Sequence, residues 1–170
     1  MEYEKYRQQR VAVIQVADYL ARWAVRKFDI DPQTGGIRIP QTFDLYHCVW
    51  HLMERRPRNL TAEPVGNLKI WLPARRAEGQ MTQKNPAYWN YLSPRRQHVV
   101  EQQLRRLFSY EFHLYVEQEL LRGVQKTEAV RSYIRRYRLG LDCEDTLLKN
   151  LQRHERALRV FLGTVKSENP

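Results

Sequence analysis

The second half of the sequence is a series of amphipathic helical patterns that are separated by single glycines. Ser93 followed by Pro94 is typical of a helix start, because serine caps free backbone N–H groups and proline fits the first helical turn. Apolar residues then recur at helical spacing and predict a helix over 94–122, which Gly123 ends. A chain with such long helical patterns has little room for a large sheet.

Two further helices follow in the same way. One is predicted over 128–139, where Thr127 would cap the start and Gly140 would end the helix. The other is predicted from about Asp145 to Leu162. The apolar side chains expected to be buried are Val130, Ile134 and Tyr137 on the first helix, and Leu147, Leu151, Leu158 and Phe161 or Leu162 on the second.

The first half mixes helical and strand patterns. Apolar spacing predicts one helix over 2–28 and another over 42–55. Short alternating stretches at 37–39 and 68–72 each follow a glycine and precede a proline, and we expect them to pair as a two-stranded β-ribbon. Residues 74–85 have no period and predict a loop.

The expected fold class is therefore mainly α, with a small two-stranded ribbon and a C-terminal pair of helices that resembles a helix-turn-helix. At 170 residues the chain suits one domain or two small ones. If there are two, we expect an N-terminal part over 1–85 and a C-terminal helical part over 86–165.

The cysteine and hydropathy patterns favour a cytoplasmic protein. Cys48 and Cys143 are far apart, lack the spacing of a disulfide framework and fit a reducing compartment. No apolar run approaches the roughly 20 residues of a membrane span, so we expect no membrane partner.

The charge favours an anionic partner. The formal net charge is +10 and the isoelectric point is about 9.9. Such an excess favours nucleic acid first, DNA more than RNA, and acidic lipid or acidic protein second.

Catalysis has little support in the sequence. His47 and His51 have the i, i+4 spacing of metal ligands, but a zinc site needs a third protein ligand that the sequence does not identify. We found no phosphate-binding glycine loop, no serine-hydrolase elbow and no CxxC pair. We therefore expect neither an enzyme nor a cofactor or metal.

Two successive helical patterns each carry a basic stripe beside an apolar one. Arg131, Arg135 and Arg138 repeat at i, i+4, i+7, and so do Lys149, Arg153 and Arg156. One helix could lie across a phosphate backbone while the next enters the major groove. The candidate nucleic-acid-binding residues are Arg131, Arg135, Arg136, Arg138, Lys149, Asn150, Gln152, Arg153, Arg156 and Arg159.

On these residues, the segment 127–160 resembles helix-turn-helix DNA-binding proteins. Gly140 followed by Leu141 matches the turn of that motif, whereas Arg136 stands where a small residue is usual and the acidic residues 142–145 lengthen the turn. The longer pattern NLKIWLP…KNPAYWNYLSPRR…LLKNLQRHER is similar to phage- or mobile-element-type bacterial proteins, a likeness that supplies no function.

The sequence thus predicts a nucleic-acid-binding protein, such as a regulator or accessory factor of a mobile element. A solvated basic surface without a partner is the simplest alternative for the two stripes. A protein-interaction module without catalytic activity is another, in which the chain forms a homodimer, most simply through the helix 94–122.

Overall fold

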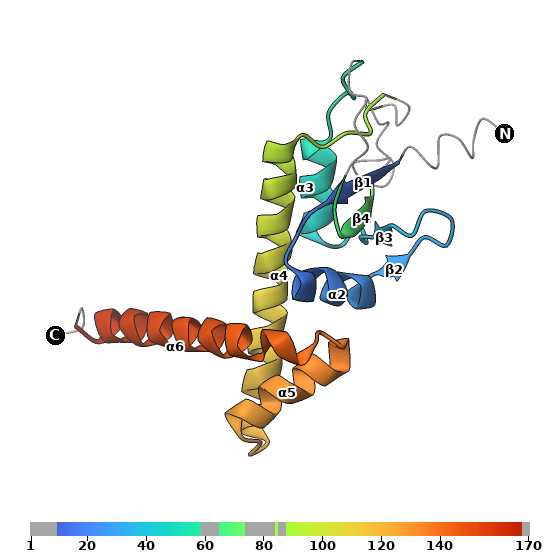
Figure 1. Cartoon of the computed structure of the whole chain (residues 1–170). Coiled ribbons are helices and arrows are strands. Elements are labelled where there is room, and N and C mark those ends of the chain that lie inside the picture. Colours follow the sequence, from blue (N-terminus) through green and yellow to red (C-terminus); the bar gives the residue numbers. More distant parts are fainter. Residues whose placement is uncertain (1–9, 59–64, 74–83, 85–87, 168–170) are drawn as a thin grey trace. The chain divides into compact units, whose positions relative to one another are not determined.

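The structure is a computed structural model, which describes residues 10–58, 65–73, 84 and 88–167 (Figure 1). The chain forms two compact units, an N-terminal unit over Met1–Arg106 and a C-terminal unit over Leu107–Pro170. The division suggested by the sequence fell at residues 85 and 86. The long helix α4, Pro94–Leu121, contributes residues to both units.

The N-terminal unit holds a small mixed sheet (Figure 1). Strands β1 and β4 are antiparallel, with Val11 opposite Trp71, and β2 and β3 form an antiparallel hairpin. Between β3 and β4 the pairing is parallel, with Ile37 opposite Ile70. The strand order is β1-β4-β3-β2, where β1 is Val11–Ile14, β2 is Asp29–Ile30, β3 is Ile37–Arg38 and β4 is Leu68–Trp71.

The sequence identified β3 and β4 and their pairing, but the prediction of a ribbon of only two strands was wrong because two more strands extend the sheet. The helix predicted over 2–28 was also wrong over Val11–Ile14, which forms the edge strand β1. The helix there, α2, spans only Asp18–Lys27. Residues 1–9 lie outside the described part of the chain.

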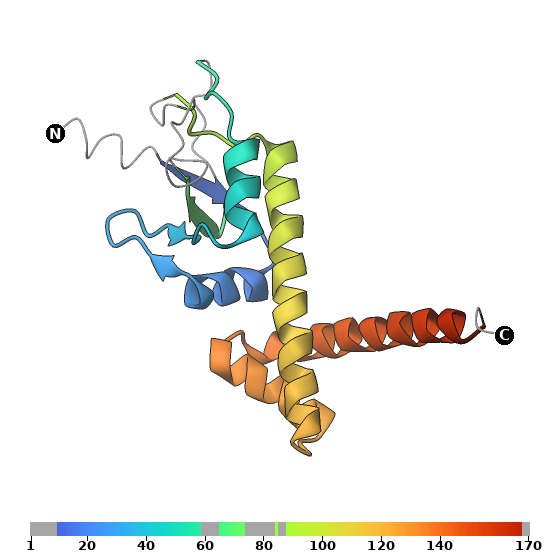
Figure 2. The same cartoon turned by 180° about the vertical axis from the view of Figure 1, so that it is seen from behind.

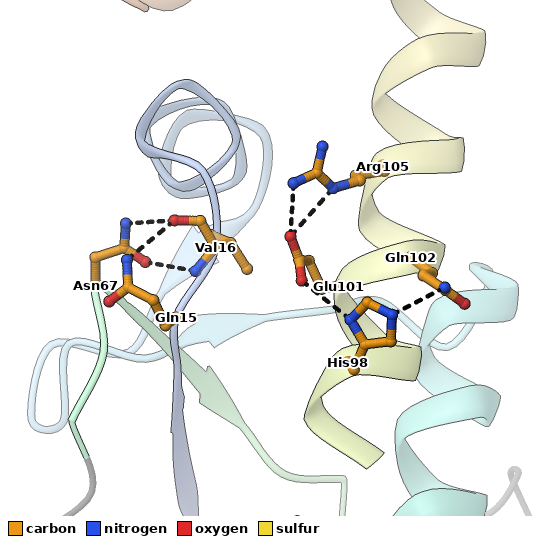
Figure 3. A network of polar contacts seen from close by, with 7 residues as sticks. All are labelled: Gln15, Val16, Asn67, His98, Glu101, Gln102 and Arg105. Carbon is orange, nitrogen blue, oxygen red and sulfur yellow. Dashed lines mark hydrogen bonds and ion pairs between the residues drawn. The ribbon is translucent and has the colours of Figure 1, made fainter. Parts of the chain in front are cut away.

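A side-chain clamp from a distant segment separates β1 from α2 (Figure 3). The side chain of Asn67 accepts a hydrogen bond from the Val16 N–H at 3.0 Å and donates one to the Val16 carbonyl at 2.8 Å. The same amide nitrogen donates to Asp18 at 3.0 Å. Because both backbone groups of Val16 are bound in this way, the chain stays extended there and the helix begins two residues later.

One face of the sheet and three helices form the core of this unit. The helices are α2, α3 (Asp44–Leu52, predicted over 42–55) and the first turns of α4, which lies beside α3 in both views (Figures 1 and 2). Burial of apolar side chains is the main stabilising contribution here. The buried side chains include Ala12, Ile14, Leu20, Trp23, Ile37, Val49, Leu68, Ile70, Val100 and Leu104.

A buried carboxylate organises the loop between β2 and β3. Asp31 is fully buried and accepts hydrogen bonds from the Thr34 N–H at 3.0 Å and the Thr34 hydroxyl at 2.8 Å, and it pairs with Arg38. Burial by itself raises the pKa of Asp31, but the contacts with Thr34 and Arg38 outweigh it, so the pKa is lowered. The loop is therefore fixed, and Gly35 within it has φ = 69°.

The C-terminal unit is helical. It contains the later turns of α4, then α5 (Lys126–Tyr137), the short 3₁₀ helix η1 (Leu141–Cys143) and α6 (Glu144–Ser167). Tyr133 lies at its centre, with 1 % of its surface exposed and its ring against four other aromatic rings. The other buried side chains are Phe108, Phe112, Val116, Ala129, Val130, Ile134, Leu139, Cys143, Leu147 and Leu151.

The predicted helices of this unit are present, with different ends. Gln125, not Thr127, is the N-cap of α5, and it makes no side-chain capping bond. The helix ends at Tyr137, and its C-cap is Arg138, which has left-handed dihedrals of 48° and 48° and lies two residues before Gly140. Helix α6 reaches Ser167, five residues beyond the predicted end.

Candidate nucleic-acid interface

Two hydrogen bonds and one glycine conformation determine the turn between α5 and α6. The Leu139 N–H bonds the Ile134 carbonyl at 3.0 Å, which satisfies an end group of α5. Gly140 follows with φ = 93°, a value that favours glycine. The thiol of Cys143 in η1 then donates to the Gly140 carbonyl at 3.0 Å. The turn is thus ordered, and the resemblance to a helix-turn-helix stays a prediction.

Two of the predicted arginines on α5 are paired with carboxylates. Arg131 contacts Glu144 at 3.0 Å, and Arg135 contacts Glu128 on its own helix. The hydrogen bond from Arg135 lowers the pKa of Glu128, so this acid is charged at neutral pH. The two ion pairs compensate much of the positive charge that the sequence suggested for this stripe.

The other two arginines of α5 do not extend that stripe. Arg136 is on a different side of the helix, where its guanidinium lies 5.7 Å from the ring centre of Tyr115 and 5.8 Å from that of Tyr137. Arg138 is exposed at the turn. The four arginines therefore do not form one basic surface on α5.

Helix α6 has a continuous basic face. Lys149, Gln152, Arg153 and Arg156 follow one another at i, i+3, i+4 and i+7, and all are exposed, as is Arg159 one turn further on. Within the described part of the chain, none of these four cations forms an ion pair. Glu155 is the only acid between residues 146 and 167. Its carboxylate is directed to Lys126 of α5, at 2.6 Å, and away from the basic face.

Asn150, the remaining candidate, faces the interior of the unit. Its side-chain oxygen lies 2.6 Å from Nε2 of His113 on α4. The His113 ring stacks on the His154 ring of α6 at 3.9 Å between centres, and His154 lies 3.8 Å from Glu117. Asn150 thus holds α6 against α4, and it is not available to read a base.

This contact predicts that the C-terminal unit is less stable in acid. Burial lowers the pKa of His113, and the neighbouring His154 lowers it further, against the opposite effects of Asn150 and Glu117. When the pKa of a histidine is lower in the folded chain than in the unfolded chain, its contribution to stability is fully present above the unfolded pKa, which is about 6.5. The contribution is lost as the pH falls from about 6.5 toward the pKa of the folded chain.

We therefore expect the free energy of unfolding of the C-terminal unit to decrease below about pH 6.5, because the unfolded chain binds the proton more readily. The substitution His113→Gln removes the titrating ring and should flatten this part of the pH profile. Far-ultraviolet circular dichroism with urea at several pH values measures both profiles. Parallel profiles for the two proteins would assign the acid sensitivity to other groups.

The distribution of charge was not foreseen from the helical stripes. The N-terminal unit has 18 lysines and arginines against 10 acidic residues, whereas the C-terminal unit has 11 against 9. Many of the N-terminal cations have structural contacts. Arg38 pairs with Asp31, Arg96 with Glu54 and Arg105 with Glu101, and Lys84 donates to the Trp50 carbonyl at 2.6 Å.

One basic-aromatic cluster on the sheet was missed by the sequence reasoning. Trp71 on β4 lies 5.3 Å from the guanidinium of Arg10 and 5.3 Å from that of Arg38. Its neighbour on the same side of the strand, Lys69, is exposed. The alternation of Lys69 and Trp71 in the sequence was the only available signal, because the two arginines come from distant segments.

The histidine pair on α3 is arranged differently from a metal site. Nε2 of His47 lies 3.0 Å from the Gln41 carbonyl, and the His51 ring packs edge-on against Trp50. Among the described residues, no three His, Cys, Asp or Glu side chains are grouped so that they could hold a metal ion.

Comparison of the chain with protein-family models, with curated proteins and with solved structures finds no match. Of the helices that the structure describes, none combines the length and the apolar character needed to cross a membrane.

Proposed function

We propose that this protein binds nucleic acid, most favourably duplex DNA, and that the exposed face of α6 makes the contacts with phosphates. The observation that carries the proposal is the group of four cations on that face, which have no carboxylate partner among the described residues. A cation that is already paired gains less from a phosphate, because its partner must be displaced or stay nearby.

The size of the face suits a phosphate backbone. From Lys149 to Arg159 the helix rises about 15 Å, at 1.5 Å per residue. Duplex DNA carries one charge per about 1.7 Å of its axis, so a face of this length meets several phosphates. Gln152 in the middle of the face is of a type that can also bond a base edge.

The mode of binding that we propose differs from the usual helix-turn-helix. In that motif the N-terminal residues of the recognition helix contact the bases. Here the N-terminus of α6 carries Glu144 and Asp145, which favour the helix dipole and repel phosphates. We therefore assign the contacts to the middle of α6, with affinity from the backbone and limited sequence preference.

Binding to a fluorescent DNA duplex, measured by anisotropy at increasing salt, tests this proposal. The logarithm of the affinity should fall linearly with log salt, at about 0.9 per phosphate that is neutralised. The double variant Arg153→Gln with Arg156→Gln should reduce the slope by up to about 1.8 and weaken binding to all sequences.

The double variant Arg131→Gln with Arg135→Gln is the matched control, because it removes the same charge from arginines that are paired with Glu144 and Glu128. This control variant should change the slope of log affinity against log salt less than the double variant on α6 does. An affinity of the native protein that does not depend on salt would contradict the proposal, and equal effects of the two double variants would contradict the assignment to α6.

A further inference from the structure

The apolar stripe of α6 continues beyond the part of the helix that is packed. Leu147 and Leu151 are buried, with 1 % and 3 % of their surface exposed. The side chains that follow on the same face are 42 % exposed at Leu158, 65 % at Phe161 and 58 % at Leu162. The sequence predicted burial of Leu158 and of Phe161 or Leu162, and that prediction was wrong for the single chain. Beyond the contact of Glu155 with Lys126, the helix extends away from α5 and α4 (Figures 1 and 2).

A helix segment of this kind needs a partner in order to be stable. Residues 156–167 make a little over three turns and include Gly163, which lowers helix propensity. Isolated helices of about 12 residues are marginal in water, and most helices in proteins are stabilised by packing of an apolar face. The exposed leucines and phenylalanine would contribute that packing if another surface covered them.

Helix α4 has a second uncovered stripe in the same unit. Leu107, Leu114 and Leu121 are spaced by seven residues, and Tyr110 lies between the first two. Tyr110 is 69 % exposed, Leu114 42 % and Leu121 89 %. These residues lie on the side of α4 opposite the buried Phe108, Phe112 and Val116. A spacing of seven with an intermediate apolar residue is typical of helices that pack lengthwise on another helix.

The charges of the two stripes are opposite. Glu111 and Glu117 border the Leu107–Leu121 stripe of α4, one on each side. Arg159 borders the apolar stripe of α6, and Glu155, which lies on the same border, is paired with Lys126. Pairing α4 with α4, or α6 with α6, would bring like charges together, whereas pairing α4 with α6 brings opposite charges together.

We propose that a second copy of this chain covers both stripes in a two-fold symmetric dimer. The segment 156–167 of each protomer lies on the Leu107–Leu121 stripe of its partner. A two-fold axis makes the same contact twice, so neither stripe stays uncovered. Specific interfaces bury on the order of 1,200 Å² or more, and six exposed large apolar side chains per protomer are available for that: Tyr110, Leu114, Leu121, Leu158, Phe161 and Leu162.

The dimer does not depend on the proposed binding of nucleic acid. Arg153 and Arg156 lie on the side of α6 opposite Leu151 and Leu158, so they stay exposed when the apolar stripe is covered. Each α6 would then present its basic face outward.

Sedimentation velocity over a range of concentrations tests the dimer. We expect the native chain to pass from monomer to dimer, and Phe161→Glu to raise the dissociation constant on the order of 100-fold. Val160→Glu is the matched control, since Val160 is 71 % exposed one residue earlier on the basic face, and it should leave the dissociation constant nearly unchanged. A native chain that is monomeric at all concentrations, or a dimer that Phe161→Glu does not weaken, would overturn the proposal.

A complementation experiment distinguishes this dimer from other helix pairings. Leu114→Glu should also prevent the homodimer, because it changes the other half of the same contact. Mixing the Phe161→Glu and Leu114→Glu proteins creates a pair with one fully native α4–α6 contact, and heterodimers should form. If the interface were α4 on α4, the Phe161→Glu protein alone would still form a dimer, and if it were α6 on α6, the Leu114→Glu protein alone would still form one. Circular dichroism of each variant should show native helix content, so that a loss of association is not a loss of folding.

Discussion

The substitution Gly66→Ala is expected to lower the free energy of unfolding of the N-terminal unit by about 3 kcal/mol, the upper part of the range for overpacked sites. A Cβ atom at residue 66 would lie 2.3 Å from the carbonyl oxygen of Ile14 and 2.4 Å from its carbon. Both are backbone atoms, so no side-chain rotation relieves the clash. The next residue, Asn67, donates its N–H to the same carbonyl at 3.1 Å, which holds β1 and β4 at this distance.

Tryptophan fluorescence during urea unfolding measures this effect, because all four tryptophans belong to the N-terminal unit. Gly163→Ala is the control for the loss of a glycine as such, followed by far-ultraviolet circular dichroism because residue 163 lies in the helical C-terminal unit. Among the described atoms, a Cβ atom there would meet nothing within 4 Å, and alanine should stabilise the helix by up to about 1 kcal/mol. A midpoint for Gly66→Ala close to that of the native protein would show that the two strands separate without cost.

The substitution Tyr133→Ala should lower the free energy of unfolding of the C-terminal unit by about 4 kcal/mol, as for other large-to-small changes of buried aromatic residues. The ring centre of Tyr133 lies 5.9 Å from that of Phe108, 5.2 Å from that of Phe112 and 4.8 Å from that of Tyr137. Removing the ring leaves a cavity among aromatic side chains of α4 and α5, which cannot close fully around it.

Urea unfolding followed by far-ultraviolet circular dichroism detects this change, since the unit is helical and lacks tryptophan. Tyr133→Leu should recover part of the loss by filling the cavity. Tyr88→Ala is the comparison for an exposed tyrosine, because 65 % of its surface is accessible, and it should change stability by less than about 0.5 kcal/mol. Equal effects at positions 88 and 133 would contradict the central place given to Tyr133.

The helices of the C-terminal half could be predicted because their signals are local. Ser93 and Pro94 mark the start of α4, and the apolar spacing over α5 depends on residues of the same helix. Strand β1 could not be predicted in this way. Val11–Ile14 is apolar throughout and fits a helical period with the residues that follow, and the clamp from Asn67 that ends it comes from 51 residues away.

The basic face of α6 was also predicted in part, because part of its signal is local. The spacing of Lys149, Arg153 and Arg156 on one helix is sufficient to place them together. The partner of Arg131, in contrast, is Glu144, which is brought near only by the turn between the helices. Periodicity also identified the apolar stripe of α6, but a period shows which side is apolar and not what covers it.

The pairing of β1 with β4 has a consequence for the order of folding. Val11 is opposite Trp71, so this pair cannot form until the 59 residues between them have folded back on themselves. The C-terminal unit has no such requirement, since its helices follow one another directly along the chain. Contacts over long sequence separations slow folding through the entropy of loop closure. During synthesis, β1 leaves the ribosome before β4 and must wait for it, and until then the backbone N–H and C=O groups of β1 on that side are accessible to the strands of other chains.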